Sequence, residues 1–457
     1  MHRLSLKARL RFRCLLAGLA GFATLGAATR ADSFSVLVEG KSAVFSHDAR
    51  TGTGSARIRV GADPALATLG NPRRCPSSAF LRLVWYPTAT NLEVGDPEVV
   101  LPCARWHAVP GGWQYDDPVG SAAGVTRLRY TTGGIALDAS GPRFTPLVGP
   151  VGFAQLSLRV GEQRHLVRFH GFRRNDERRV ESRPTSAAAA AGERAFWATL
   201  GGDGDQSDRA IELLRRAVER DRQDGRSWFL LGMIRLWRFE LVAPDPRRPG
   251  DTATREIVSA GAALDRAAAL LWSGDRGDSR VPGFAAAASY KAGVATGDLA
   301  LVDEAIAAMR HLAEVNPLFN TFIPFGMGPI ESPDSERYAY VLDLLDVAFP
   351  AIAGACVGQG EICFNDGLAP HNLEGTLLLF GDLYAKGGRR EQARSSYRTA
   401  AALGETNGWS PFFVGRARAL AAAVDERVDR YLDGDPWNDP PFTDLGGRGN
   451  CAACHNR

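Results

Sequence analysis

The sequence lacks a strong excess of charge of either sign. Of 457 residues, 54 are Lys or Arg and 51 are Asp or Glu, which leaves a formal net charge of +3. A nucleic-acid-binding protein shows a marked basic excess, so this near-balance gives that class no support. Lysine is scarce, and it occurs only at positions 7, 41, 291 and 386. We interpret the surplus of Arg as the codon bias of a GC-rich genome rather than as a phosphate-binding device.

Long apolar runs and the common catalytic motifs are also missing. After the N-terminus, no segment has the ~18 uninterrupted apolar residues of a membrane-spanning helix. The sequence contains no phosphate-binding glycine loop followed by Lys-Ser/Thr, no GxSxG turn and no HExxH helix. With 45% hydrophobic and 23% charged residues, the composition is that of an ordinary globular protein. It excludes wholesale disorder, a coiled-coil rod and a polytopic membrane protein.

The N-terminus has the three-part pattern of an export signal. Residues 1–13 are basic, residues 14–28 are apolar, and small residues follow at Ala28 and Ala31. The apolar run is too short to span a bilayer as a mature helix. We therefore predict a cleaved signal peptide over residues 1–31, with an uncleaved N-terminal anchor as the alternative. The mature protein is expected in the periplasm of a bacterium or outside the cell.

Seven cysteines are present, and six of them lie beyond the signal peptide in three local pairs. In an oxidising compartment, an even set of cysteines of this kind predicts disulfides. We predict the bridges Cys75–Cys103 and Cys356–Cys363, the second of which closes a short Gly-containing loop. Buried thiols are the alternative for each pair.

The third pair belongs to a C-x-x-C-H motif, Cys451–His455. This is the attachment signature of c-type haem. Two thiols three positions apart can reach the two vinyl groups of one porphyrin, and the adjacent His can bind the iron from the proximal side. We predict one covalent haem c, with thioethers at Cys451 and Cys454 and with His455 as the proximal ligand. A third disulfide or redox pair, and a zinc or copper site, are the alternatives.

Only two residues follow the motif, whereas a self-contained cytochrome c domain builds its haem pocket mostly from residues after it. We therefore expect the haem to dock on the preceding domain, to lie exposed on a tail, or to sit at an interface with a partner. The segment upstream, residues 433–450, is rich in Gly, Pro and Asp. It is predicted to form an irregular strap, so that 433–457 is a tail that carries the motif.

The iron has a sixth coordination position, and two residues are candidates for it. His371 lies in a turn before a predicted helix and is the first candidate, although helix capping or packing is its alternative role. Met327 lies in a Gly/Pro-rich loop and is the runner-up. A filled sixth position suits electron transfer, and an open one suits small-molecule or peroxide chemistry.

The mature chain divides by pattern into a β-rich part and a helical part. Residues 32–175 alternate apolar and polar residues at period two, between clusters of Gly, Pro, Asn and Asp, which predicts an antiparallel β-sandwich. The predicted strands are 34–39, 55–60, 80–86, 124–130, 152–160 and 164–172. Residues 176–190 are a charged, Ser/Pro/Ala-containing segment that we predict to be a linker.

Residues 191–432 carry apolar residues at three- and four-residue spacing, which predicts an all-α domain. One stretch places small residues where the two helices of a 34-residue helical hairpin touch. This series is Leu377, Gly381, Tyr384, Ala393, Tyr397 and Ala400. The domain therefore resembles tetratricopeptide repeats in divergent copies, which implies a short α-solenoid with a concave face. A non-repetitive helical bundle is the alternative.

Residues 369–457 show a more specific resemblance. The matching features are Ala369 to Gly375, Gly381-Asp382, Lys386, Tyr397, Trp409-Ser410-Pro411 and the closing Cys451–His455. In these features the chain resembles a group of exported helical-repeat proteins that end in C-x-x-C-H. The resemblance implies a terminal haem site rather than a truncated gene, and it brings no established activity with it.

Two classes of function follow from these predictions. The first is an exported monohaem c-type cytochrome-like protein whose helical repeats choose a protein redox partner for single-electron transfer. The second is a non-enzymatic periplasmic scaffold that binds a protein or envelope component, with the C-x-x-C-H motif as a disulfide or metal clasp. A haem enzyme of the peroxidase type is a third hypothesis, with no other catalytic motif to support it.

Overall fold

The computed structural model describes most of the chain between residues 33 and 455. The described ranges are 33–38, 41–48, 50–51, 53–73, 79–87, 94–95, 99–141, 151–161, 163–170, 172–201, 205–243, 245–273, 276–356, 369, 371–435, 438–442 and 453–455. The chain forms two compact units. We call Asp32–Thr199 with Asp203–Ile323 the sandwich unit, and Pro324–Arg457 the C-terminal unit. The predicted signal peptide lies outside the described residues.

The sandwich unit begins with β-strands. Their bounds are β1 Ser33–Val36, β2 Ser42–Asp48, β3 Thr53–Val60, β4 Ala79–Pro87, β5 Val94–Gly95, β6 Val99–Leu101, β7 Trp106–Val109, β8 Gly112–Asp116, β9 Val125–Thr131, β10 Gly134–Gly141, β11 Val151–Val160, β12 Gln163–Phe169, β13 Phe172–Asn175 and β14 Arg179–Ser182. Two short 3-10 helices, η1 Pro64–Leu66 and η2 Cys103–Arg105, lie between them.

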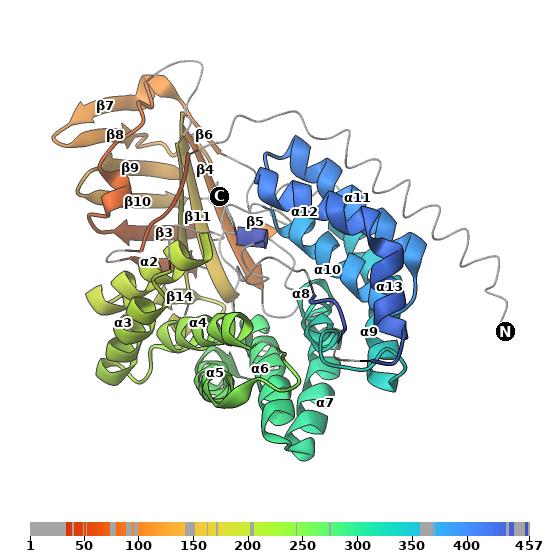
Figure 1. Ribbon diagram of the computed structural model, residues 1–457. Helices are drawn as coiled ribbons and strands as arrows, with labels where there is room; N and C mark the ends of the chain where they lie inside the picture. The colour runs from red at the N-terminus through yellow and green to blue at the C-terminus, as the bar shows by residue number, and fades with distance from the viewer. Residues whose placement is uncertain are drawn as a thin grey trace. The chain divides into compact units, whose positions relative to one another are not determined.

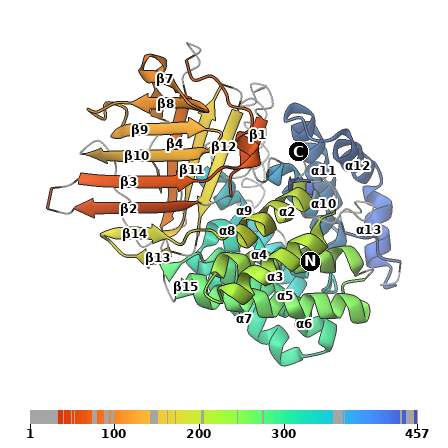
Figure 2. The same cartoon turned by 90° about the vertical axis from the view of Figure 1, so that its left-hand side faces the viewer.

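These strands form two sheets. One has the order β1-β12-β11-β4-β5, with β6 also paired to β4. The other has eight strands in the order β13-β14-β2-β3-β10-β9-β8-β7, and Figure 2 shows this order along the face of the sheet. The described strands pair antiparallel, apart from β1, which runs parallel to β12. The predicted N-terminal antiparallel sheets are therefore confirmed, with one parallel edge that the pattern did not indicate.

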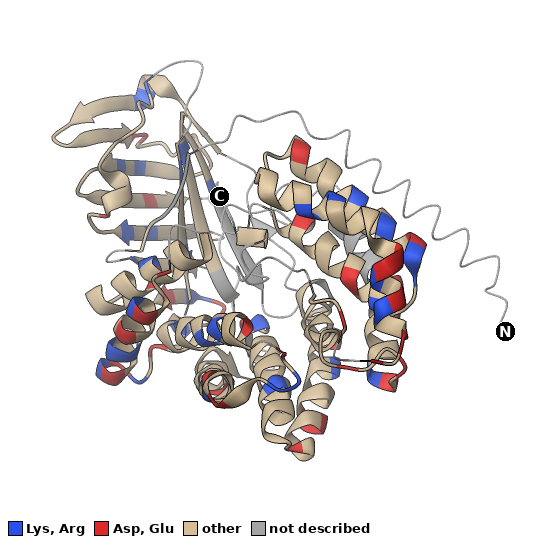
Figure 3. Ribbon diagram, in the orientation of Figure 1, with Lys and Arg blue, Asp and Glu red and all other residues tan. Residues whose placement is uncertain are grey.

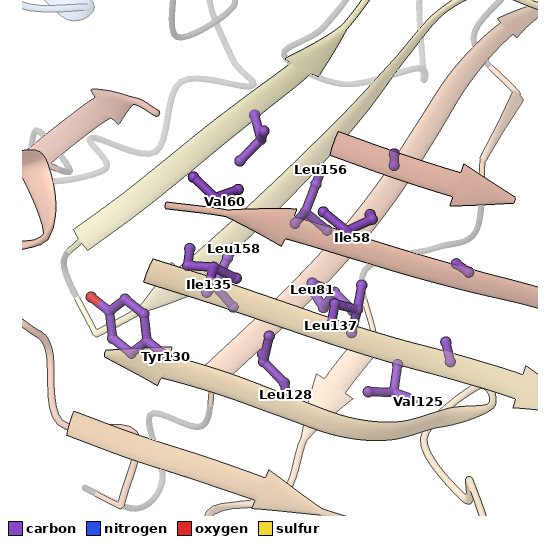
Figure 4. Close-up of a cluster of buried hydrophobic side chains, with 14 of the residues drawn as sticks. Ile58, Val60, Leu81, Val125, Leu128, Tyr130, Ile135, Leu137, Leu156 and Leu158 are labelled. Atoms are coloured by element: carbon purple, nitrogen blue, oxygen red, sulfur yellow. The ribbon is translucent and has the colours of Figure 1, made fainter. Parts of the chain in front are cut away.

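The core lies between the two sheets. Ile58 and Leu137 from the eight-stranded sheet pack with Leu81, Leu156 and Leu158 from the other sheet (Figure 4). All five side chains are buried. Each strand buries alternate residues, because successive side chains point to opposite faces of a sheet. Burying one such side chain contributes roughly 1.5–3 kcal/mol, so this two-layer core is what holds the sheets together.

The predicted linker contains structure. Within residues 176–190, β14 pairs with β2 and β13, and helix α2 (Ala187–Gly201) begins before the segment ends. In β14, Val180 and Ser182 are buried, and they alternate with Arg179 and Glu181, which are partly exposed. This alternation suits a half-buried strand. Two of the charges that indicated a linker, Arg179 and Glu181, therefore belong to a strand, and the charged residues 176–178 form the bend before it.

Helices α2 to α8 complete the sandwich unit (Figure 1). The bounds beyond α2 are α3 Ser207–Arg220, α4 Gly225–Val242, α5 Gly250–Leu271, α6 Arg280–Thr296, α7 Leu299–Val315 and α8 Pro317–Asn320, and a hairpin of β15 Trp272–Ser273 and β16 Arg276–Gly277 separates α5 from α6. Consecutive helices approach closely at glycines. A Cβ added to Gly232 would lie 2.5 Å from Leu264, and one added to Gly293 would lie 2.8 Å from Val302.

Lys41 and Glu193 connect the sandwich to its helices. The Lys41 Nζ lies 3.0 Å from Glu193 Oε2, and Arg226 Nη2 lies 3.1 Å from Glu193 Oε1. Lys41 and Glu193 are both buried. Residues before β2, on α2 and on α4 therefore share one buried ion cluster, which is expensive to break once it has been buried.

The C-terminal unit is helical. Its elements are α9 Glu336–Cys356, α10 Asn372–Lys386, α11 Arg390–Thr406, α12 Pro411–Ala422 and α13 Val424–Leu432, and the 3-10 helix η3 Ile323–Met327 lies at its start. An added Cβ at Gly381 of α10 would overlap the ring of Tyr397 on α11. This is the contact that the small-residue series predicts. The helical segment predicted as one domain, 191–432, is nevertheless divided between the two units.

Charges of both signs are interspersed over the described helices (Figure 3). This distribution agrees with the balanced composition of the sequence. Among the described helices, none is both long enough and apolar enough to cross a lipid bilayer.

Candidate functional site

The site begins at the first turn of α10. His371 is the N-cap residue of this helix, and its carbonyl accepts a 2.9 Å hydrogen bond from the amide of Gly375. Glu374 occupies the first turn, where a carboxylate interacts favourably with the positive end of the helix. The Ala369-Pro370 sequence before His371 disfavours helix there, so the helix starts where the sequence predicts.

The C-x-x-C-H motif packs against this turn. Residues 453–455 are helical, with Ala453 buried and Cys454 and His455 half-buried. The last carbonyls of a helical segment have no partner inside the helix and need one from elsewhere. Trp409 Nε1 donates to the Ala453 carbonyl at 2.9 Å, and the His371 backbone amide donates to the Cys454 carbonyl at 3.1 Å. Two distant residues thus cap the motif.

Gly375 provides the space for this contact. An added Cβ there would overlap Cys454 Sγ and lie 3.1 Å from the Cys454 amide nitrogen. The same Sγ lies 3.9 Å from the Asn372 carbonyl oxygen. The second thiol of the motif is therefore seated on the first turns of α10, at a position that no residue larger than glycine can occupy without moving it.

A buried polar group lies beside the motif. His371 is 6% exposed, and its Nδ1 has no hydrogen-bond partner within the described part of the chain. This atom lies 3.9 Å from Oε1 of Glu374, which is fully buried and accepts a hydrogen bond from Asn407 Nδ2. Burial raises the pKa of Glu374, but the neighbouring His371 and Asn407 outweigh this effect and lower the pKa below its ordinary value. The carboxylate is thus held ionised next to the imidazole.

Aromatic rings form the other wall of the site. The Trp409 ring lies 6.1 Å from that of His371, centroid to centroid, and stacks on Phe413 at 5.3 Å. A Cβ added to Gly404 would lie 2.6 Å from Trp409, so this glycine admits the indole. Trp409 is buried, and its indole N–H donates to the Ala453 carbonyl of the motif. A buried Trp usually has a hydrogen-bond partner of this kind for its N–H.

The tail that precedes the motif is anchored at α13. Residues 433–435 and 438–442 are irregular, whereas 453–455, within the tail predicted to be irregular, are helical. Tyr431 Oη donates to the Pro440 carbonyl at 2.8 Å, and Arg427 Nη2 donates to the Pro441 carbonyl. Arg427 is itself held by the buried Asp382, with Nε 3.0 Å from Oδ1. Burial lowers the pKa of Arg427, but the Asp382 carboxylate outweighs this effect and raises it.

The described ends of the tail lie at opposite ends of α10. Phe442 is 5.6 Å from Lys386 Nζ, at the last residue of the helix, whereas Cys454 contacts the helix at Asn372 and Gly375. The two contacts are 11 helical positions apart (386 − 375), or about 16 Å at the usual rise per residue. The tail is thus attached to both ends of α10.

The two sixth-ligand candidates are placed differently. His371 adjoins the motif through its own backbone. Met327 is buried, and the next residue, Gly328, packs against Leu383 and accepts a 3.0 Å hydrogen bond from Lys386 Nζ. Met327 therefore belongs to the far end of α10. The structure joins His371 to the Cys454 carbonyl, and it places Met327 at the other end of α10.

The predicted disulfides fall largely outside the described residues. Cys75 and Cys363 lie there entirely, as does Cys451 of the motif. Cys103 opens η2, and Cys356 is the last residue of α9. Both bridges remain predictions. Within the described ranges, no three His, Cys, Asp or Glu side chains are grouped as a metal site.

Several residues of the site were not predicted as such from the sequence. Trp409 and Gly375 had been noted only as parts of a resemblance, and Arg427 not at all. The Trp409-Ser410-Pro411 sequence, with Pro at the first position of α12, marks a helix start. This local sequence does not indicate that the Trp409 indole would donate to the Ala453 carbonyl, 44 residues later.

Comparisons of the chain with protein-family models, with curated proteins and with solved structures found no match.

Proposed function

We propose that the protein is an exported monohaem c-type cytochrome-like protein, with one haem c bound covalently to Cys451 and Cys454 and with His455 as the proximal iron ligand. The bound haem would supply one-electron redox chemistry. The chain's own part is to seat the motif on α10 and to restrict the access of water to it. We propose single-electron exchange with a protein partner as its activity.

The observation that carries this proposal is the capping of the motif. Trp409 and His371 satisfy the carbonyls of Ala453 and Cys454, and both donor residues are themselves buried. A tail that only trailed in solvent would need no such partners, because water would satisfy its carbonyls. These hydrogen bonds support a motif that occupies a fixed position on the C-terminal unit.

The residues of the site also suit a haem group chemically. Gly375 leaves Cys454 Sγ at the surface of α10, and His455 is half-buried rather than buried. The rings of Trp409 and Phe413 supply an apolar neighbourhood of the kind that a porphyrin favours. These features support attachment at the motif.

For the sixth iron position we propose His371. Glu374 lies on its Nδ1 side, and a carboxylate there orients the imidazole so that Nε2 is the coordinating nitrogen. Met327 remains the second candidate, although it is placed at the other end of α10. We further propose that the helices form a divergent repeat array of the tetratricopeptide type, because Gly232, Gly293 and Gly381 each admit the next helix.

The alternative function is a periplasmic protein-binding scaffold. In that case, the motif would be a disulfide or metal clasp that fastens the tail to α10. The anchoring of the tail by Arg427 and Tyr431 would serve such a clasp equally well. The two functions differ in whether a porphyrin is attached, which can be measured directly.

The test is expression of the full chain in a host competent for cytochrome c maturation. We expect a haem-stained band on a denaturing gel and the visible spectrum of haem c. A Cys451→Ser/Cys454→Ser variant should lose the band, and a Cys356→Ser/Cys363→Ser variant serves as the matched double-cysteine control that retains it. A wild-type protein without the band would contradict the haem proposal and favour the clasp.

A second variant tests the sixth ligand. His371→Ala should change the ferric spectrum from low-spin to high-spin, whereas Met327→Leu should leave it low-spin. The His371 backbone amide that caps Cys454 is kept in this variant, so docking of the motif persists. An unchanged spectrum in His371→Ala would restrict His371 to its capping role.

A further inference from the structure

Two rows of side chains cross the outer face of the eight-stranded sheet, on the side away from the core. The first row follows the register of β3, β10, β9 and β8 and consists of Arg57, Asp138, Arg127 and Asp116. The second row lies two residues further along each strand and consists of Arg59, Ala136, Arg129 and Gln114. Because side chains alternate along a strand, both rows point away from buried neighbours such as Ile58 and Leu137.

The first row alternates in charge, and Figure 3 shows the blue of β3 and β9 on either side of the red of β10. Arg57 Nε lies 3.5 Å from Asp138 Oδ1, and Arg127 Nε lies 3.2 Å from Asp116 Oδ1. Arg59 reaches Asp138 from the second row, with Nη2 2.8 Å and 3.1 Å from its two oxygens. A carboxylate thus already lies among Arg side chains on this face.

The second row has no acidic residue. Ala136 and Gln114 stand on the strands that contribute Asp138 and Asp116 to the first row. Arg129 lies between them on β9. It is exposed, and it makes no hydrogen bond or ion pair with any residue in the described part of the chain. The guanidinium of Arg129 therefore lacks the carboxylate that Arg127 has one row away.

The two rows together are positively charged. Four Arg and two Asp give a net charge of 4 − 2 = +2. The next strand, β2, adds only Ser42 and Val44 to the rows. Beyond β2, Glu181 of β14 is itself held by Arg173 and Arg179, so it does not offset this charge. The face is complementary to a partner with negative charges.

The strand spacing indicates how the negative charges of a partner would be arranged. Ala136 on β10 and Gln114 on β8 lie on either side of β9, which places them two strand spacings, or about 10 Å, apart. A polymer lying across the strands, with carboxylates repeated along it, would place negative groups on both sides of Arg129. Such a polymer would provide in the second row what Asp138 and Asp116 provide in the first.

The same rows lack the anchors of a protein interface. Among their described residues, from β2 to β8, there is no Phe, Tyr or Trp, and Val44 is the one large apolar side chain. Protein partners obtain most of their binding energy from buried aromatic or apolar anchors. A hydrophilic polyanion needs none, because each of its contacts is an ion pair at the surface.

We propose that this face of the sheet binds an acidic polysaccharide, whose sugar carboxylates pair with Arg129 and, beside it, with Arg57 and Arg127. The Arg57 and Arg127 side chains are 72% and 61% exposed, so a chain on the surface can reach them. One exposed ion pair is weak, and the affinity comes from several sugar units bound at once. This inference is independent of the haem proposal.

The test uses the full chain with polygalacturonate as the probe, and with methyl-esterified polygalacturonate as the matched neutral polymer. Isothermal titration calorimetry at low salt should show binding of the acid and not of the ester. Added salt should weaken the binding, because attraction between exposed charges is screened.

A charge-removing variant locates the binding. Arg129→Gln should weaken the affinity for polygalacturonate about fivefold, the size of one exposed ion pair. Arg215→Gln is the matched control, since Arg215 lies on α3 and its side chain is 60% exposed. It removes the same charge from another surface of the same unit and should bind as the wild type does.

A second variant fills the second row from within. Ala136→Asp would place a carboxylate beside Arg129, as Asp138 lies beside Arg127 in the first row. It should compete with the polymer and also weaken its binding. Ala136→Ser changes the same position without adding charge and should retain the wild-type affinity.

The proposal is overturned if Arg129→Gln and Ala136→Asp bind polygalacturonate as tightly as the wild type does. Equal binding of the acid and of its methyl ester would also overturn it, because the contact would then not use the carboxylates. If the wild type binds phosphatidylglycerol vesicles or duplex DNA but not polygalacturonate, the face serves a membrane or a nucleic acid, and the choice of a polysaccharide is wrong.

Discussion

The indole nitrogen of Trp409 lies 2.9 Å from the carbonyl oxygen of Ala453, in a buried hydrogen bond that joins residues 44 positions apart. This contact, together with the amide of His371 on the Cys454 carbonyl, completes the capping of a three-residue helical turn. The motif thereby obtains partners for its carbonyls from the N-cap of α10 and from Trp409, two residues before α12.

Replacing Trp409 by Phe should destabilise the C-terminal unit and free the motif. The variant keeps most of the apolar ring but leaves the buried Ala453 carbonyl without its donor, which costs about 1–3 kcal/mol. Urea unfolding measures the loss of free energy, and amide exchange at residues 453–455 measures the release.

Trp237→Phe is the matched control for this prediction. Trp237 is also buried, but its indole nitrogen has no hydrogen-bond partner in the described part of the chain. We expect a smaller loss from it and no change in exchange at the motif. Equal losses in the two variants would show that packing alone, and not the hydrogen bond, gives Trp409 its importance.

Gly375→Ala should displace the motif without unfolding α10. The added methyl group would overlap Cys454 Sγ, while alanine favours the helix itself by about 1 kcal/mol over glycine. We expect faster amide exchange in the last nine residues and an unchanged helical circular dichroism signal.

Gly261→Ala provides the comparison. Gly261 lies inside α5, and nothing is within 4 Å of an added Cβ there. That variant should be slightly stabilised, with wild-type exchange at the C-terminus. If Gly375→Ala also leaves the exchange unchanged, Cys454 is not held on α10 in solution.

Arg427→Gln should be strongly destabilising. It leaves the fully buried Asp382 carboxylate without its cation, and breaking a buried pair in this way costs about 3–5 kcal/mol. It also removes the donor to the Pro441 carbonyl, so the strap should become accessible to protease.

Arg390→Gln removes a pair between exposed residues on α11 and α13, Arg390 and Asp429, and should have little effect on either measurement. Adding Asp382→Asn to Arg427→Gln should recover part of the lost stability, since it removes the unpaired charge. A double variant no more stable than Arg427→Gln would argue against the ion pair as the source of the loss.

The sandwich unit should lose stability in acid through Glu193. Burial raises the pKa of this carboxyl, but Lys41 and Arg226 outweigh burial and lower it from 4.5 to about 2. A folded-state pKa below the unfolded one means that the contribution is fully present above pH 4.5 and is lost as the pH falls toward 2. Urea midpoints measured between pH 5 and pH 2.5 should therefore fall less steeply in Glu193→Gln than in the wild type.

Other carboxyls, such as Asp117 and Glu374, also have pKa values below their ordinary values, and they too contribute to the loss of stability in acid. The prediction therefore concerns the difference between wild type and variant. Asp245→Asn, which alters a half-exposed pair, should keep the wild-type slope. Equal slopes in all three proteins would contradict the assigned role of Glu193.

The fold was predictable where its signals are local. Period-two alternation located strands such as β3, β4 and β11 to within one or two residues. It did not separate β14 from a charged linker, because Arg179 and Glu181 dominate the composition of a strand whose buried partners are Val180 and Ser182. The parallel pairing of β1 with β12 joins residues more than 120 positions apart, and no local pattern encodes it.

The site divides in the same way. The C-x-x-C-H motif and the turn at His371 are visible in the sequence because each depends on adjacent residues, and the chemistry expected of them stays a prediction. The contact of Cys454 with the start of α10 joins residues 82 positions apart, and the Asp382–Arg427 pair joins residues 45 apart. Such contacts depend on how the helices pack. The sequence therefore indicated which chemistry to expect at the C-terminus. The packing of the helices shows which residues hold Ala453 and Cys454 of the motif in place.

Peptide mapping of the exported protein tests the central claim most directly. Trypsin should cleave after Arg448 and release residues 449–457, which contain the whole motif. From a host competent for cytochrome c maturation, we predict that this peptide carries the mass of one haem and that the Cys451→Ser/Cys454→Ser peptide does not. A wild-type peptide found unmodified, or with only an internal Cys451–Cys454 disulfide, would contradict a haem at the C-terminal motif.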